Sequence, residues 1–328
     1  MTVLQQVLFE VESSYFGHPY YVSGHALFNA IARQADEATR RALCVSHGVF
    51  VPGEYGEFPA TQSESGYAGV LGSSLPSVES YDDLFAYRDP AQRWLLESRA
   101  RDAHNTHDVQ SHGGRLTFAP TCYFGRPPEL RNSKRSVQWF VQCYLHAGRT
   151  NDGVVPVDED VLAGLQVGGA RNYGLGELSV ADTQRVDLAA LDYDRLTDSE
   201  DDGYVLELVS PYVMSSTYPE ADDQSIPWWW ATAHASTRPV DDGLRRREER
   251  LVTGGDMHTL ECVDHGQVVG YAGSDPVTTA RNGVMRVGTH SRYGFGELRV
   301  RPASDDRVPD RAEQTRNIEE PDSSGSEV

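Results

Sequence analysis

Alternation of apolar and polar side chains predicts a strand near the start of the chain. Val7, Phe9 and Val11 occupy alternate positions, and Glu10 and Glu12 fall on the opposite side. Such a period of two is typical of a strand with one buried face. Gly17 and Pro19 follow and mark a loop.

A helix is predicted next. Ser23 can cap a helix that begins at about Gly24, because a serine oxygen accepts from free N–H groups of the first turn. Its apolar face would consist of Leu27, Phe28, Ile31 and Ala35, which share the helical spacing.

Further segments follow the same two patterns. The sequence predicts strands over 136–145, 177–180, 204–209 and 297–300, a strand or hairpin over 260–271, and a helix over 91–101. Prolines open two short helical stretches, at 157–165 and 277–285, as proline does in a first helical turn.

The chain contains an internal repeat. VGGARNYGLGELSV (residues 167–180) matches VGTHSRYGFGELRV (residues 287–300) at eight of 14 positions, and the same offset of 120 pairs Pro156-Val157 with Pro276-Val277. A match that includes a tyrosine and three glycines indicates two homologous domains, each with the order helix, glycine loop, strand.

The predicted fold class is α+β, with two ferredoxin-like domains. The first domain reads β-α-insert-β-α-β, which is most of a β-α-β-β-α-β unit. We expect the domains to cover residues 1–182 and 183–302, with large inserts as surface loops, followed by a disordered acidic tail at 303–328.

Composition points to a particular environment. The formal net charge is −20, and Lys134 is the only lysine, which favours adaptation to a cytoplasm of very high salt, where the screening length falls to roughly 3 Å. The four scattered cysteines suit a reducing compartment. Apolar runs are strand-sized, and the N-terminus lacks a basic region and a long apolar region, so we expect neither a transmembrane helix nor a signal peptide.

The glycine loops allow two interpretations. Glycines alone would satisfy a tight turn, but the triplets Arg171-Asn172-Tyr173 and Ser291-Arg292-Tyr293 add cations, hydrogen-bonding groups and aromatic rings beside backbone N–H groups. That combination suits RNA phosphate, 2′-hydroxyl and base contacts. The candidate RNA-binding residues of the loops are Gly168, Gly169, Arg171, Asn172, Tyr173, Gly174, Gly176, Gly288, His290, Arg292, Tyr293, Gly294 and Gly296.

Nucleotide-cofactor motifs fit poorly. Gly169 and Gly174 have P-loop spacing, but Leu175 stands where that loop needs lysine, and a dinucleotide fingerprint needs a strand before and a helix after the glycines. We therefore expect no cofactor.

The loops GGARNYGLGEL and GTHSRYGFGEL resemble the C-terminal glycine-rich loop of the RAMP superfamily, the ferredoxin-like subunits of class 1 CRISPR effector complexes. SGHALFNAIAR (23–33) is similar to the superfamily's first helix, and VDHGQVVGY (263–271) to its G-x-V hairpin. The resemblance covers most of residues 3–300, although only the glycine loops are specific and the inserts follow no family pattern. The acidic composition is similar to that of a derived, array-less RAMP module of extreme halophiles.

The resemblance implies a cytoplasmic, non-catalytic subunit of an antiviral ribonucleoprotein, with a guide-like RNA and other RAMP-type subunits as partners. Two fused modules are similar both to subunits that cap the guide RNA's 5′ end and to guide-processing ribonucleases. The rival hypothesis is therefore a metal-independent endoribonuclease that uses His25 or His18, since imidazoles can act as base and acid near neutral pH. A purely structural subunit is a third possibility.

Other clusters have competing interpretations. Two basic patches are further candidates for phosphate contact: Arg131, Lys134 and Arg135, and Arg245, Arg246 and Arg247; the second patch also fits a solvated helix. His104, His107 and His112 could bind a transition metal, but we favour a polar loop and expect no metal site. Trp228, Trp229 and Trp230 cannot all face one core, so at least one should be exposed or in an interface.

Overall fold

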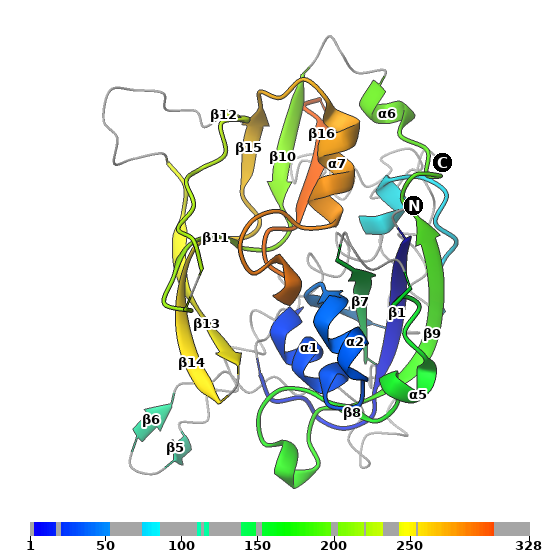
Figure 1. Ribbon diagram of the computed structural model, residues 1–328, viewed down its shortest axis with the longest axis vertical. Coiled ribbons are helices and arrows are strands. Elements are labelled where there is room, and N and C mark those ends of the chain that lie inside the picture. Colours follow the sequence, from blue (N-terminus) through cyan, green and yellow to red (C-terminus); the bar gives the residue numbers. More distant parts are fainter. Residues whose placement is uncertain are drawn as a thin grey trace, which may run out of the picture.

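The computed structural model describes residues 3–17, 21–52, 74–85, 110–112, 115–117, 139–148, 153–197, 203–219, 221–231, 243–253 and 255–304. Within these ranges the chain is a mixed α+β protein with several antiparallel sheets and few helices, which confirms the predicted class. Figure 1 shows one sheet in the lower half of the molecule, a second above it and a long hairpin at one side. No helix in the described ranges is long and apolar enough to span a membrane.

The first sheet is built on three long strands, β1 (Val3–Val11), β7 (Trp139–Ala147) and β9 (Glu177–Asp187). Its order is β2-β4-β7-β1-β9-β8, where β2 is Tyr21–Val22, β4 is Gly48–Pro52 and β8 is Leu165–Gln166; β3 (Leu43–Val45) also pairs with β7. Every pairing is antiparallel. The predicted strands at the N-terminus and at 136–145 are thus confirmed, with boundaries shifted by a few residues.

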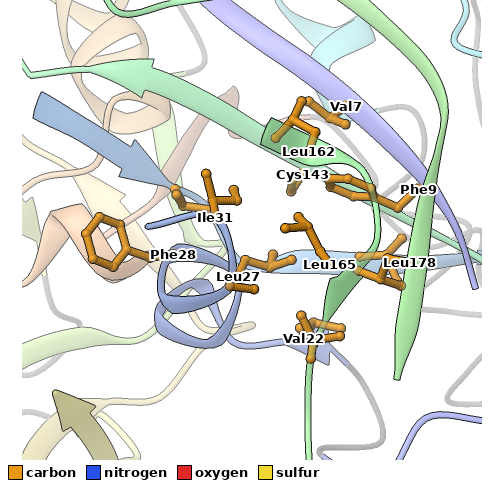
Figure 2. Close-up of a cluster of buried hydrophobic side chains, with 14 of the residues drawn as sticks. Val7, Phe9, Val22, Leu27, Phe28, Ile31, Cys143, Leu162, Leu165 and Leu178 are labelled. Atoms are coloured by element: carbon orange, nitrogen blue, oxygen red, sulfur yellow. The ribbon is translucent and has the colours of Figure 1, made fainter. Parts of the chain in front are cut away.

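Helices α1 (Gly24–Ala32), α2 (Glu37–Ala42) and α5 (Glu159–Leu162) belong to this half. Leu27 and Ile31 of α1 are buried in one cluster with inward side chains of the sheet such as Phe9 and Cys143, as predicted (Figure 2). Phe28 is also buried, but its ring lies on the side of α1 away from Phe9 and contacts Tyr293. Alternate residues of β7 face this core because side chains alternate along a strand.

The predicted cap of α1 by Ser23 is wrong. Ser23 occupies the N-cap position but its side chain makes no capping hydrogen bond. Instead, the Gly24 N–H donates to Nδ1 of His47 at 2.8 Å. An imidazole from a distant residue thus satisfies an N–H group that local capping leaves free.

The second sheet has the order β12-β15-β10-β16, with β12 at Trp230–Ala231, β15 at Val268–Tyr271, β10 at Tyr204–Leu208 and β16 at Leu298–Pro302. Helix α7 (Pro276–Val284) begins with its proline as predicted and packs on this sheet through Ala280 and Val284. The described residues between β10 and β12 contain no helix; they form strand β11 (Tyr212–Ser216).

A third sheet has the order β11-β14-β13, with β14 at Asp256–Val263 and β13 at Arg246–Thr253. Two predictions are corrected here. Residues 260–271 are neither one strand nor a hairpin, since β14 and β15 belong to different sheets. Arg246 to Arg250 lie on a strand, which excludes the solvated helix.

Residues 74–85, which include the 3₁₀ turn Asp82–Phe85, lie between the two halves. Tyr81, Leu84 and Phe85 share a buried cluster with side chains of both sheets. The Asp82 carboxylate pairs with Arg299 at 2.8 Å and with Arg195 at 2.9 Å. Two minor elements remain, the hairpin β5 (Gln110–His112) and β6 (Arg115–Thr117) and the single turn α6 (Asp194–Thr197).

Some predictions lie outside the described residues. These are the helix at 91–101, the patch Arg131, Lys134 and Arg135, the histidines His18, His104 and His107, and nearly all of the tail at 303–328.

Candidate nucleic-acid interface

The two copies of the repeat fold in the same way. We call residues 168–176 the first glycine loop and 288–296 the second. Each contains a 3₁₀ turn, Arg171–Tyr173 or Ser291–Tyr293, flanked by left-handed residues. Ala170 and His290 precede the turns with φ of 57° and 61°. Because both loops repeat this backbone, the sequence repeat is a structural repeat.

The last glycine of each loop is required by a close backbone approach. Gly176 and Gly296 have φ of 74° and 79°, and a Cβ atom there would stand 1.9 Å from the carbonyl oxygen of Val167 or Val287. The same valines donate their N–H groups to the glycine oxygens at 2.9 Å in both copies. No other residue type fits a positive φ together with that contact.

A second repeated element was missed from the sequence. The segment after the first strand of each half holds its glycine loop by the same bonds. Ser13 Oγ accepts from Glu177 N at 2.9 Å, and Ser210 Oγ accepts from Glu297 N at 2.8 Å. The carbonyls that follow, of Ser14 and Pro211, accept from the last glycines of the loops at 2.9 and 2.8 Å.

A tyrosine completes each of these segments, Tyr15 in the first and Tyr212 in the second. Their rings lie against the glycines that open the loops, Gly168 and Gly288. The signal in the sequence is Ser-x-Tyr after each strand. It escaped notice because the inserts shift it to an offset of 197, different from that of the glycine loops.

The first glycine loop presents its side chains to solvent. Tyr173 is 77% exposed, Asn172 is exposed and Arg171 is half-buried. Within the described ranges these three side chains have no hydrogen-bond, ion-pair or ring partner. One short turn, which ends at the left-handed Gly174, therefore carries a cation, an amide and an aromatic ring.

The second glycine loop is packed against the first half. The Arg292 guanidinium lies 4.5 Å from the centre of the Phe28 ring, and its Nε donates to the Leu43 carbonyl at 3.2 Å. The Tyr293 ring meets Phe28 edge to face at 5.1 Å. The repeat thus supplies the same residue types to two different environments, and Arg292 and Tyr293 connect the halves.

The remaining residues of the second loop are also close to neighbouring elements. A Cβ atom on Gly294 would meet the His47 ring at 2.4 Å. His290 Nε2 lies 3.0 Å from Ser216 Oγ. Burial, with a smaller contribution from the charge of His258, lowers the pKa of His290.

The basic patch of the second half is split by strand β13. Arg245 and Arg246 are exposed, whereas Arg247 turns toward the first half. Its Nε lies 2.8 Å from a Glu249 carboxylate oxygen, and its Nη1 lies 3.5 Å from Asp264. Glu249 also accepts from the Tyr21 hydroxyl at 3.1 Å. Arg247 is therefore held by neighbouring carboxylates, so the three arginines do not form one surface.

Of the two histidines proposed for catalysis, only His25 lies in the described ranges. It is in the first turn of α1, and burial lowers its pKa to about 4. Its Nδ1 is buried and has no hydrogen-bond partner among the residues that the structure describes. A neutral imidazole at physiological pH can accept a proton but has none to give as a general acid.

The tryptophan run and the histidine cluster are the two remaining candidates from the sequence. Trp228 is 80% exposed while Trp230 is 4% exposed, which confirms that the three tryptophans do not share one core. The described residues contain no group of three or more His, Cys, Asp or Glu side chains that could hold a metal ion. His112 lies in β5, and the other two histidines of that cluster are outside the described ranges.

No protein-family model matches the sequence, and no curated protein is significantly similar to it.

Proposed function

We propose that this protein is a non-catalytic RNA-binding subunit of a CRISPR-type ribonucleoprotein, and that its first glycine loop contacts a guide-like RNA. The observation that carries the proposal is the exposure of Asn172 and Tyr173, next to the half-buried Arg171, on a glycine-flanked turn. Neighbouring RAMP-type subunits would be the protein partners.

The strand order supports two tandem ferredoxin-like RAMP domains. The expected boundary between residues 1–182 and 183–302 falls within β9, which pairs with β1 as far as Asp187, so the first domain extends at least to Asp187. A β-α-β-β-α-β unit places its strands in the order 4-1-3-2. The first sheet contains β9-β1-β7-β4, and the second is β16-β10-β15-β12, both antiparallel. The second domain departs from the pattern, because β11 stands where the first helix belongs.

The chemistry of the first loop fits single-stranded RNA. An arginine adds charge-assisted bonds to phosphate oxygens, an amide can bond base edges or a 2′-hydroxyl, and an exposed tyrosine provides a face on which a base stacks. A net charge of −20 does not oppose this contact, because the surrounding acidic surface is screened within a few ångströms at high salt.

The rival ribonuclease hypothesis has less support. His25 is half-buried, and its lowered pKa of about 4 leaves it neutral at pH 7. A base and an acid are both needed to transfer the protons of 2′-hydroxyl attack and 5′-oxygen departure. A structural subunit remains the alternative, with the exposed Trp228 as its best contact residue.

A binding assay tests the proposal. Labelled single-stranded RNA of mixed sequence would be titrated with the full chain in molar KCl and EDTA, with RNA integrity checked on a gel. We expect Arg171→Ala/Tyr173→Ala to weaken binding about tenfold or more, since stacking contributes roughly 1–3 kcal/mol per base. Arg185→Ala, an exposed arginine on β9, controls for charge alone.

Three outcomes would count against the proposal. Equal affinity of the double variant and wild type would mean that the first loop is only a turn. Failure of the wild type to retain any RNA would favour the structural subunit. Cleavage in EDTA that disappears in His25→Ala would favour the ribonuclease.

A further inference from the structure

A phenylalanine lies beside the first glycine loop. Phe16 follows the buried Tyr15 at the end of the segment that holds this loop, and its carbonyl oxygen accepts from the Gly169 N–H at 2.7 Å. The residue is half-buried, and within the described ranges its side chain has no ring or cation partner. An aromatic side chain therefore stands next to the loop and keeps part of its surface open to solvent.

Contact with this ring explains why residue 169 is a glycine. Gly169 does not have a positive φ, so its backbone conformation does not by itself require glycine. A Cβ atom there would stand 2.7 Å from Cδ1 of Phe16 and 3.2 Å from Cε1. The Cδ1–Cε1 edge of the ring thus lies against the glycine backbone, and a side chain between them would displace the ring.

The second copy of the repeat lacks such a ring. The residue equivalent to Phe16 is Val213, which is 1% exposed and belongs to the buried cluster of the third sheet. The residue equivalent to Gly169 is Thr289, whose hydroxyl forms hydrogen bonds with the segment 221–231. A partly exposed aromatic ring therefore accompanies only the loop that is itself exposed.

Phe16 and Tyr173 are associated with the two ends of one short stretch of chain. Tyr173 comes four positions after Gly169, the residue that Phe16 contacts. Even a fully extended chain of four residues spans less than about 14 Å, and the 3₁₀ turn Arg171–Tyr173 shortens this path. Neither ring has a ring partner in the described ranges. One short RNA strand can therefore reach both rings, and each ring can receive its own base.

We propose that Phe16 is a second base-stacking residue of the first glycine loop, so that the site takes at least two nucleotides of unpaired RNA. One base stacks on Tyr173 and another on Phe16, while Arg171, which lies between the two contacts in the sequence, meets a phosphate group. Stacking tolerates any sequence because every base has a π-face, but it needs bases that are free of a duplex. This inference rests on the proposed function of the loop and adds the class of RNA that the loop binds.

Binding to RNA with and without bases tests the proposal. The full chain in molar KCl and EDTA would be titrated with a mixed-sequence single strand, with an abasic strand of the same length, and with the mixed sequence as a duplex. We expect Phe16→Leu to weaken binding to the mixed-sequence strand about fivefold or more, and to change binding to the abasic strand by less than about twofold. Distortion of the loop would weaken binding to both strands, so the comparison separates stacking from a structural role.

Two further variants complete the test. Phe16→Tyr is the matched control, because it keeps an aromatic ring at this position and should keep the affinity of the wild type within about twofold. Asn172→Ala/Tyr173→Ala covers the case in which Phe16→Leu does not fold, since both of its side chains are exposed. If Phe16 stacks on a base of its own, this double variant still binds the mixed-sequence strand more tightly than the abasic strand.

Several results would overturn the role of Phe16 and leave the proposed function standing. These are equal affinity of Phe16→Leu and wild type for the mixed-sequence strand, an equal loss on the abasic strand, and equal binding of both strands by Asn172→Ala/Tyr173→Ala. Binding of the duplex as tightly as the single strand would also overturn it, since paired bases cannot stack on the rings. Failure of the wild type to bind any of the three RNAs would overturn the role of Phe16 and the proposed function together.

Discussion

Each glycine loop carries one arginine, at adjacent rather than equivalent positions of the repeat, since Arg171 aligns with Ser291. Because Arg171 and Arg292 lie in different environments, the pair allows a test of tertiary context. Arg292→Ala removes the stacking on Phe28 and the hydrogen bond to Leu43. A hydrogen bond from a charged donor contributes about 1.5–3 kcal/mol and a partly buried cation–π contact about 0.5–2 kcal/mol. Because both depend on the same side chain and are partly solvated, we expect a combined loss of about 2–3 kcal/mol.

Arg171→Ala is the control. Its side chain has no partner in the described ranges, so its removal should change the free energy of unfolding by less than about 0.5 kcal/mol. Urea denaturation in molar KCl, followed by circular dichroism, would measure both variants. Urea is preferred to guanidinium because guanidinium is itself a salt.

The comparison also has a clear contrary result. Equal stability of the two variants would show that Arg292 does not join the halves through Phe28 and Leu43. Arg292→Lys separates the contribution of the charge from that of the stacking on Phe28, because an ammonium group keeps the charge but cannot stack as a planar group. We expect that variant to recover less than half of the loss.

Three further predictions follow from single positions. Gly176→Ala should destabilise the protein by several kcal/mol, because its Cβ would collide with the Val167 carbonyl. Gly174 has open space around a φ of 78°, so Gly174→Ala should cost only about 1–2 kcal/mol. Thermal melts would distinguish the two variants. Burial lowers the pKa of His25 to about 4, so the protein should lose about 2 kcal/mol of its free energy of unfolding as the pH falls from above 6.5 to 5. His25→Gln should flatten the plot of urea midpoint against pH. A plot parallel to that of the wild type would contradict this. Trp228→Ala should leave stability nearly unchanged because the side chain is 80% exposed, while Trp230→Ala, at 4% exposure, should cost about 3–5 kcal/mol.

Much of the local structure could be predicted because its causes are local. The period of two at Val7, Phe9 and Val11 marks β1, and the spacing of Leu27, Phe28 and Ile31 marks the buried face of α1. Pro276 indicates where α7 begins, because it stands in the first turn of that helix. Sheet membership could not be predicted in the same way. Residues 260–271 have the pattern of strands, but that pattern does not indicate which sheet each strand joins.

The shared backbone of the two glycine loops follows from the repeated sequence alone. The positive φ angles and the contact between Gly176 and the Val167 oxygen depend on residues a few positions apart. The same residues at the same spacing therefore form the same turn in both copies. The surroundings of each loop depend on the tertiary fold. Arg292 packs against Phe28 of α1 and Leu43 of β3, which are far away in sequence, whereas Tyr173 stays exposed. Packing between distant segments leaves no local pattern from which it could be predicted.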